Sequence, residues 1–143
     1  MIGILGAGAF GTALAVALAK GGREVRLWAR DAGQVRAMRE TRVSAALPGV
    51  TLPKGIGVHE DLTEVIGGEA LLLAVPMQAL GGLLDQWPVI DGRQPLVACC
   101  KGVDLASLQG PVALTLARRP GAVAAILTGP SFAADIARGL PTA

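Results

Sequence analysis

Three glycines near the start of the chain constrain its fold more than any other feature. Gly6, Gly8 and Gly11 form a Gly-x-Gly-x-x-Gly pattern directly after the apolar run 2–5. Glycines at this spacing let the backbone turn tightly out of a strand, approach a pyrophosphate closely and pack the next helix against the sheet. The phosphates then lie at the positive N-terminal end of that helix, where backbone N–H groups lack intrahelical partners.

The residues around the glycines support this interpretation, since such a pattern also arises by chance in a chain with 20 glycines. Residues 12–20 are mostly Ala, Leu and Val, which predicts a helix, and Gly21-Gly22 ends it. Residues 24–28 then begin a second strand. Strand, glycine turn, helix and strand together predict a dinucleotide-binding fold; a merely structural glycine turn is the alternative.

The end of the second strand bears on which dinucleotide binds. An Asp or Glu about twenty positions after the glycines contacts the adenine ribose, whereas Arg holds a 2′-phosphate through two N–H donors. Arg30 occupies or adjoins this position, which favours NADP(H), with NAD(H) as a tolerated second cofactor. An ordinary solvated arginine is the alternative. Asp31 is placed either to bind the ribose or to cap the next helix.

Composition and charge limit the remaining classes of protein. The 143 residues are enough for one domain with an aliphatic core, since 52% are hydrophobic and 3% aromatic. A net charge of +2 without a basic cluster argues against nucleic acid as a partner. The chain shows neither a signal peptide nor an apolar run of about 18 residues. We therefore expect a cytoplasmic protein without a membrane span.

The cysteines and the histidine suggest no chemistry. Cys99 and Cys100 are adjacent, and a disulfide between neighbours is strained, so we expect two buried, reduced thiols. His59 is the one histidine, and no set of metal ligands accompanies it. We expect it in a loop or at a strand edge, and we expect no metal site.

Strands and helices alternate along the rest of the chain. The pattern predicts strands over 56–59, 70–75, 95–100 and 123–127. It predicts helices over 32–41, 60–66, 77–87 and 105–118, the last of which Gly110-Pro111 either kinks or restarts. A final helix is predicted after the turn at 128–133, ending at Gly139. This alternation predicts an α/β fold, a Rossmann-type doubly wound and mainly parallel sheet.

Ligands of such sheets bind beyond the carboxyl ends of the strands. Five loops are expected there, namely 6–11, 30–31, 75–78, 101–102 and 129–133.

The motifs resemble those of one known family. In chain order they are Gly6-Ala7-Gly8-Ala9-Phe10-Gly11, Leu27-Trp28-Ala29-Arg30, Val75-Pro76, Lys101-Gly102, Gly129-Pro130-Ser131-Phe132-Ala133 and Gly139-Leu140-Pro141-Thr142-Ala143. Together they resemble the bacterial NAD(P)-dependent glycerol-3-phosphate dehydrogenases, over the whole chain. The last two motifs are the specific ones, because the glycine pattern with Val-Pro alone also fits ketopantoate reductases and other hydroxyacid dehydrogenases.

The resemblance implies roles for particular residues. The implied cofactor contacts are Gly6, Gly8, Ala9, Phe10, Gly11, Arg30, Pro76, Lys101 and Ala133. The substrate, dihydroxyacetone phosphate or sn-glycerol 3-phosphate, would contact Lys101, Gly129 and Ser131. Lys101 offers a cation to a substrate oxygen, with a solvated loop lysine as the alternative. The Ser131 hydroxyl is also placed to cap the last helix.

The chain departs from the family by stopping at Ala143. The family continues with the rest of the sheet and a helical domain that supplies the proton-transfer lysine. We therefore expect residues 1–143 to be an incomplete NAD(P)-binding domain with no catalytic residue, inactive alone, and with apolar surface left uncovered. A homodimer is compatible with the sequence.

The leading hypothesis is thus the cofactor-binding part of an enzyme that makes sn-glycerol 3-phosphate for glycerophospholipid synthesis. The alternatives are a ketopantoate-reductase-like NADP-linked reductase, and a non-catalytic NAD(P)-binding domain.

Overall fold

Six short parallel strands form one sheet, in the order β3-β2-β1-β4-β5-β6 within residues 1–86 and 94–141, which this computed structural model describes. Gly3 and its neighbours in β1 pair with β2 on one side and β4 on the other, so that Ile4 lies opposite Leu27 and Leu72. The strands are β1 (Ile2–Leu5), β2 (Val25–Trp28), β3 (Ile56–His59), β4 (Ala70–Leu73), β5 (Leu96–Ala98) and β6 (Ala124–Ile126). The predicted doubly wound sheet is confirmed.

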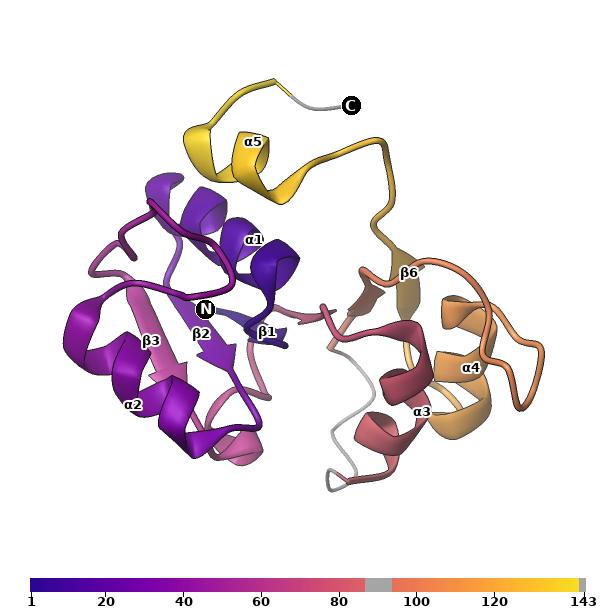
Figure 1. Cartoon of the computed structure of the whole chain (residues 1–143). Helices are drawn as coiled ribbons and strands as arrows, with labels where there is room; N and C mark the ends of the chain where they lie inside the picture. The colour runs from indigo at the N-terminus through magenta and orange to yellow at the C-terminus, as the bar shows by residue number, and fades with distance from the viewer. Residues whose placement is uncertain (87–93, 142–143) are drawn as a thin grey trace.

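Helices cover both faces of this sheet (Figure 1). Residues of α1 (Ala9–Lys20), α2 (Ala32–Thr41) and α5 (Ala133–Arg138) belong to the buried cluster on one face. Residues of α3 (Met77–Gln86) and α4 (Pro111–Arg118) belong to the cluster on the other face. The first three strands are added to the sheet in one direction from β1, and β4 to β6 are added in the other direction. The strand order therefore reverses between β1 and β4.

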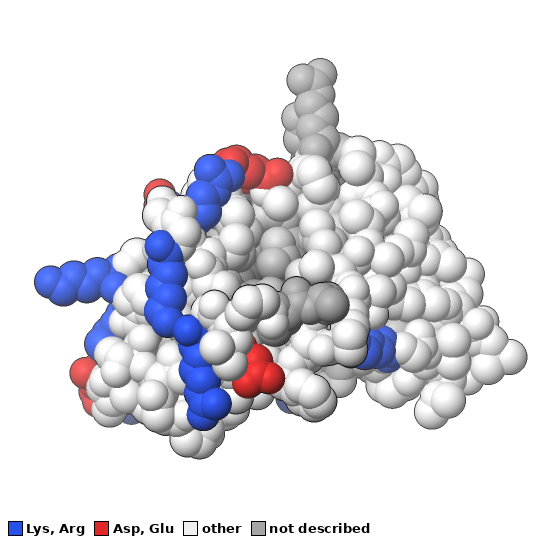
Figure 2. All heavy atoms as spheres, turned by 90° about the horizontal axis from the view of Figure 1, so that it is seen from above, with Lys and Arg blue, Asp and Glu red and all other residues white. Residues whose placement is uncertain are grey.

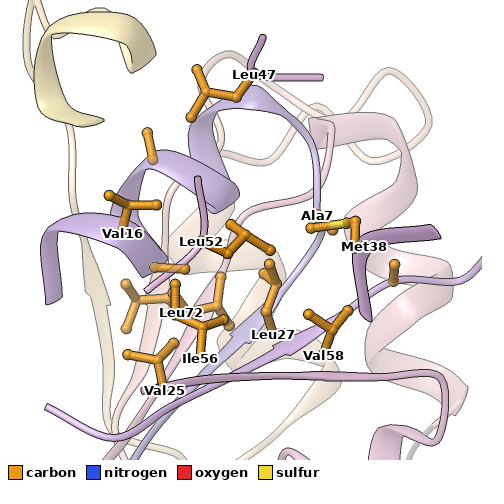
Figure 3. Close-up of a cluster of buried hydrophobic side chains, with 14 of the residues drawn as sticks. Ala7, Val16, Val25, Leu27, Met38, Leu47, Leu52, Ile56, Val58 and Leu72 are labelled. Carbon is orange, nitrogen blue, oxygen red and sulfur yellow. The ribbon is translucent and has the colours of Figure 1, made fainter. Parts of the chain in front are cut away.

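Alternation of side chains along β1 supplies both cores, since successive residues of a strand point to opposite faces. Ile4 packs in the cluster with Leu27 and Val16 of α1, drawn in part in Figure 3. Leu5 packs in the other cluster with Leu80 and Leu84 of α3. The central strands are apolar on both faces for this reason.

The last helix is held to the first. The ammonium of Lys20, at the end of α1, donates to the carbonyl of Ala137 in α5 at 2.7 Å. Ala137 is itself buried against the first core. Figure 1 shows α5 lying over α1, so residues more than a hundred positions apart form one edge of the molecule.

The helix predicted over 60–66 is wrong. The chain forms a single 3₁₀ turn there, Leu62–Glu64, which begins after Asp61. The Asp61 carboxylate accepts hydrogen bonds from the backbone N–H and the hydroxyl of Thr63, at 2.8 and 2.7 Å. Such a local side-chain turn competes with helix formation, and the turn ends before Gly67, whose φ is +92°.

The helix predicted from residue 105 begins only at Pro111. Before it, the Asp104 carboxylate accepts from the N–H and hydroxyl of Ser107 at 2.8 and 2.7 Å, and Leu108 has a φ of +56°. The residue before a proline avoids helical backbone angles, while proline fits the first position of a helix. Of the kink and the restart that the sequence left open at Gly110-Pro111, the structure shows the start of a helix, α4.

The other predicted elements are confirmed, with ends that shift by one to three residues. Three of the predicted positions, Trp87, Thr142 and Ala143, lie outside the described residues. Among the described residues no helix is long and apolar enough to cross a membrane.

Several large apolar side chains are exposed near the C-terminal edge of the sheet. On the face drawn in Figure 2, Lys and Arg gather toward the side that carries α2 and β3. Strand β6 is an edge strand; its Ile126 is 48% exposed, and Val123 and Leu127, which flank the strand, are 54% and 41% exposed. Leu105 and Phe132 are 74% and 73% exposed. The expected uncovered apolar surface is present in this chain.

Leu80→Ala is expected to destabilise the protein by about 2–5 kcal/mol, because Leu80 is fully buried in the second core and its loss leaves a cavity. Urea denaturation followed by circular dichroism measures the change in the free energy of unfolding. Leu105→Ala is the matched control, since that side chain is 74% exposed, and should change it by no more than about 0.5 kcal/mol. Equal losses in the two variants would contradict the described packing.

Candidate functional site

A cleft of about 480 Å³ opens beyond the carboxyl ends of β1, β2 and β4. We call it the glycine cleft. The structure brings four of the predicted site residues together in it, Gly6, Gly8, Arg30 and Pro76. Its other lining residues are Ala7, Trp28, Ala29, Gln34, Ala46, Val75, Ala79, Gly82, Leu83 and Gln86. The cavity at the switch in strand order thus contains more of the predicted site residues than the other cavity described below.

A second, smaller hollow of about 190 Å³ lies between α1, α5 and the end of β6. We call it the α1–α5 hollow. It contains three more predicted residues, Phe10, Gly129 and Ser131. The remaining lining residues are apolar or small, namely Leu14, Leu127, Thr128 and Ile136. Lys101 lies beside it, because its ammonium donates to the Gly129 carbonyl at 2.8 Å.

Besides Lys101, three predicted residues line neither cavity. Ala9 is the first residue of α1, Ala133 is the first residue of α5, and Gly11 is buried in the first turn of α1. All three remain close in sequence to residues that do line a cavity. Their positions make them part of the frame around the two cavities.

The three glycines of the motif are required for three different reasons. Gly6 has a φ of +116°, and a Cβ there would collide with the carbonyl of Ala74. A Cβ on Gly11 would collide with the Gly6 carbonyl, so this glycine permits close packing of α1 on the end of β1. A Cβ on Gly8 would meet no protein atom within 4 Å. The space beside Gly8 therefore belongs to the cleft.

The N-terminus of α1 has neither a side-chain cap nor an acidic residue in its first turn. Gly8 is its N-cap residue. The Thr12 N–H donates the first hydrogen bond of the helix, to the Gly8 carbonyl at 2.9 Å. The N–H groups of the residues between them point out of the helix end, together with the positive end of its dipole. This arrangement suits a phosphate.

The two charged residues after β2 have different environments. The Asp31 carboxylate accepts from the backbone N–H of Gln34 at 2.6 Å, and so caps α2. Of the two roles left open by the sequence, the structure shows the cap. Arg30 is exposed on the glycine cleft and forms no hydrogen bond or ion pair with another described residue. Its guanidinium is available to an anion in the cleft.

The cysteines at the end of β5 are free and buried, as predicted. They belong to cores on opposite faces of the sheet, so the two thiols point away from each other. Burial, together with the neighbouring Cys100, raises the pKa of the Cys99 thiol to about 12. Burial also raises the pKa of Cys100. Both thiols stay protonated and unreactive near neutral pH.

The histidine lies at the edge of the sheet, as predicted. His59 ends β3, the edge strand, and its Nδ1 lies 2.9 Å from a Glu64 carboxylate oxygen. It lines neither cavity. Within residues 1–86 and 94–141 there is no group of three or more His, Cys, Asp and Glu residues that could hold a metal ion.

The N-cap position of α5 differs from the predicted one. The N-cap residue is Phe132, one position after Ser131, and the Phe132 side chain forms no capping hydrogen bond. The helix therefore begins at Ala133, and Ser131 instead lines the α1–α5 hollow.

Of the lining residues that were not predicted, two form hydrogen bonds that shape the glycine cleft. Trp28 donates its indole N–H to the Glu60 carbonyl at 2.9 Å, which fixes the ring as a wall of the cleft. Gln34 donates its amide Nε2 to the Ala7 carbonyl at 2.8 Å. The position of Trp28 at the end of the second strand, beside the predicted cofactor site, could have indicated its role from the sequence. The hydrogen bond from Gln34 to Ala7 could not, because it forms only when α2 folds against the glycine turn.

The parallel sheet, the glycine turn and the open helix end together define a Rossmann-type, dinucleotide-binding domain. Over residues 1–143 the sequence matches the family described as the N-terminus of NAD-dependent glycerol-3-phosphate dehydrogenase. The chain belongs to this family, as the resemblance of its motifs predicted.

Known relatives extend well beyond the matched region. The chain is 53% identical over 142 residues to a protein of Paracoccus denitrificans named glycerol-3-phosphate dehydrogenase (NAD(P)+), covering 99% of this chain and 43% of that protein. It is 57% identical over 145 residues to a protein of the same name from Cereibacter sphaeroides, covering 100% and 42%. The chain therefore spans less than half the length of these curated relatives.

A solved structure shares the fold. The glycerol-3-phosphate dehydrogenase of Coxiella burnetii superimposes with a TM-score of 0.90 at 32% sequence identity. The match covers 99% of this chain and 44% of that one.

Two glycine variants should separate packing from binding. Gly8→Ala should leave the free energy of unfolding within about 0.5 kcal/mol, since its φ of −73° suits alanine and its Cβ meets no protein atom. It should weaken NADPH binding, because the methyl group occupies the cleft. Gly11→Ala should lower the free energy of unfolding by about 1–3 kcal/mol or more through the collision with Gly6.

Urea denaturation and calorimetric titration with NADPH measure the two quantities. A Gly8→Ala protein that binds NADPH as tightly as the wild type would contradict the assignment of this space to a ligand.

Proposed function

We propose that this chain is the cofactor-binding part of an oxidoreductase that interconverts sn-glycerol 3-phosphate and dihydroxyacetone phosphate by hydride transfer. The family match over residues 1–143 is the observation that carries the proposal. We place the product in glycerophospholipid synthesis. The family assignment replaces the ketopantoate-reductase-like alternative considered for the sequence.

The glycine cleft fits the adenosine and pyrophosphate half of an NAD(P) molecule. The empty space at Gly8 lets the pyrophosphate approach the backbone, and the N–H groups at Ala9, Phe10 and Gly11 face it from the helix end. Arg30, exposed on the same cleft, would bind the 2′-phosphate of NADP(H). NADP(H) is therefore the proposed preferred cofactor, with NAD(H) accepted.

The commitment of Asp31 to the cap of α2 supports this preference. A carboxylate free to bind the ribose 2′-OH would repel a 2′-phosphate. Here the Asp31 carboxylate caps α2, and the charged group exposed on the cleft is the Arg30 guanidinium.

The α1–α5 hollow fits the reacting end of the complex. The nicotinamide supplies or accepts the hydride. Ala133 is assigned to the cofactor side of this region, and Gly129 and Ser131 to its substrate side. Pro76, which lines the glycine cleft, is also assigned to the cofactor. The Lys101 ammonium has three N–H donors, of which the Gly129 carbonyl accepts one, so it can hold the cofactor and a substrate oxygen as well.

Reduction of a ketone leaves an alkoxide that needs a proton. The resemblance of the motifs implies that the lysine that transfers this proton lies outside residues 1–143, in the region of the relatives that this chain does not span. We assign Lys101, beside the α1–α5 hollow, to binding.

The 143-residue chain is accordingly expected to bind NADPH without catalysing its oxidation by dihydroxyacetone phosphate. Absorbance at 340 nm in the presence of NADPH and dihydroxyacetone phosphate should fall no faster than without protein, while calorimetry shows saturable NADPH binding. Sustained oxidation that depends on dihydroxyacetone phosphate would contradict the assignment of the proton donor. Failure to bind either NADPH or NADH would contradict the proposed function as a whole.

Arg30→Ala should raise the Kd for NADPH at least about tenfold and leave the Kd for NADH nearly unchanged, because only NADPH carries the 2′-phosphate and a charged hydrogen bond is worth about 1.5–3 kcal/mol. Calorimetric titrations with the two cofactors measure both constants. Arg36→Ala is the control, since Arg36 is an exposed arginine of α2 that lines neither cavity. Equal losses for NADPH and NADH would mean that Arg30 has a structural role.

A further inference from the structure

The first turn of α2 contains half of a familiar capping arrangement. In a capping box, the N-cap side chain accepts from the N–H three residues later, and the Glu or Gln there accepts in return from the N-cap N–H. Asp31 and Gln34 have this spacing, and the Asp31 carboxylate accepts from Gln34 N–H at 2.6 Å. Among the described residues, the return bond is absent. The Gln34 amide instead donates to Ala7, 27 positions earlier, at 2.8 Å.

Ala7 is the residue between the first two glycines of the motif, and α2 holds it at two points. Its carbonyl accepts the bond from Gln34. Its methyl group is buried, and Figure 3 shows it beside Met38, one helical turn after Gln34. Two side chains on one face of α2 therefore fix both the backbone and the side chain of Ala7.

The bond from Gln34 orients a peptide group that glycines leave free to rotate. Gly6 and Gly8 flank Ala7, and glycine imposes the weakest restriction on backbone rotation. In a trans peptide, the Ala7 carbonyl and the Gly8 N–H point in opposite directions within one plane. Holding the carbonyl toward α2 therefore fixes the direction of the Gly8 N–H and the path of the chain into α1.

We infer that Gln34 is a positioning residue, which holds the Ala7–Gly8 peptide in the orientation that receives the pyrophosphate before the cofactor arrives. A binding loop that is already in its bound conformation loses less conformational entropy on binding. The inference rests on the proposed function, and it assigns Gln34 a role shared by both cofactors, unlike that of Arg30. The Gln34 side chain lines the glycine cleft, but its N–H₂ group is engaged with the protein.

Gln34→Met removes the donor and keeps the length of the side chain. The expected result is a Kd for NADPH and a Kd for NADH that both rise about fivefold to tenfold, by equal factors, because a hydrogen bond contributes about 1 kcal/mol net and the pyrophosphate is common to both. Gln109→Met is the matched control. Gln109 is a half-buried glutamine that lines neither cavity, and its variant should bind both cofactors as the wild type does.

A second variant, Gln34→Glu, tests the donor without changing the shape. An ionised carboxylate cannot donate to the Ala7 carbonyl and repels it, whereas a protonated carboxyl group can donate. The affinity of Gln34→Glu for NAD⁺, relative to wild type, should therefore be low at pH 7.5 and should recover toward pH 4, since the ordinary pKa of a glutamate side chain is about 4.3. A merely structural contribution to the stability of α2 would not produce this recovery, and NAD⁺ has no 2′-phosphate to titrate.

The outcomes separate the inference from the proposed function. If the wild type binds neither cofactor, the proposed function fails. If the wild type binds and both Gln34 variants bind equally well at all pH values, only the inference fails. A loss confined to NADPH would also overturn it, because Gln34 would then recognise the 2′-phosphate. If Gln34→Met binds both cofactors as the wild type does and only Gln34→Glu binds weakly, the inference also fails, because an ionised Glu repels the pyrophosphate directly. Should Gln34→Met not fold, Gln34→Leu, which also removes the donor without adding a charge, takes its place.

Discussion

The site depends on the close approach of α1 to the end of β1. Gly11 allows that approach, because the Cβ of any other residue would collide with the Gly6 carbonyl. Gly6 in turn leaves the strand with a φ of +116°, next to the Ala74 carbonyl at the end of β4. The end of the helix thereby comes to lie at the switch in strand order, beside the open space at Gly8. The glycine cleft and the proposed anion site both depend on this one contact.

Residues at this helix end line both cavities, Gly8 the glycine cleft and Phe10 the α1–α5 hollow, and the two cavities differ in chemistry. The glycine cleft has Arg30 at its border, while the α1–α5 hollow is mainly apolar, with Lys101 anchored beside it through the Gly129 carbonyl. A dinucleotide has the same asymmetry, since one half carries the adenosine and its phosphates and the other carries the reacting ring. The docking of α5 on α1, through Lys20 and the Ala137 carbonyl, forms the second cavity from residues remote in sequence.

Much of the fold could be predicted from the sequence, because the buried strands are continuous apolar runs and glycines end the helices. The strand of residues 70–73 and the helix of residues 32–41 are examples. Prediction failed at 60–66 and 105–110, where short side-chain turns at Asp61 and Asp104 compete with the helix. Of the site, the glycines and Arg30 were found from their spacing. The bond from Gln34 to Ala7 was missed because it joins two elements that meet only after folding.

The central claim is that backbone amides at the glycine turn bind the pyrophosphate of NAD(P). Amide hydrogen exchange of the 143-residue chain, measured with and without saturating NADPH, tests it most directly. The account predicts that exchange slows at residues 8–11, at the turn and the first turn of α1, and around Arg30. Unchanged exchange at residues 8–11, with NADPH bound and protection confined to other segments, would contradict it.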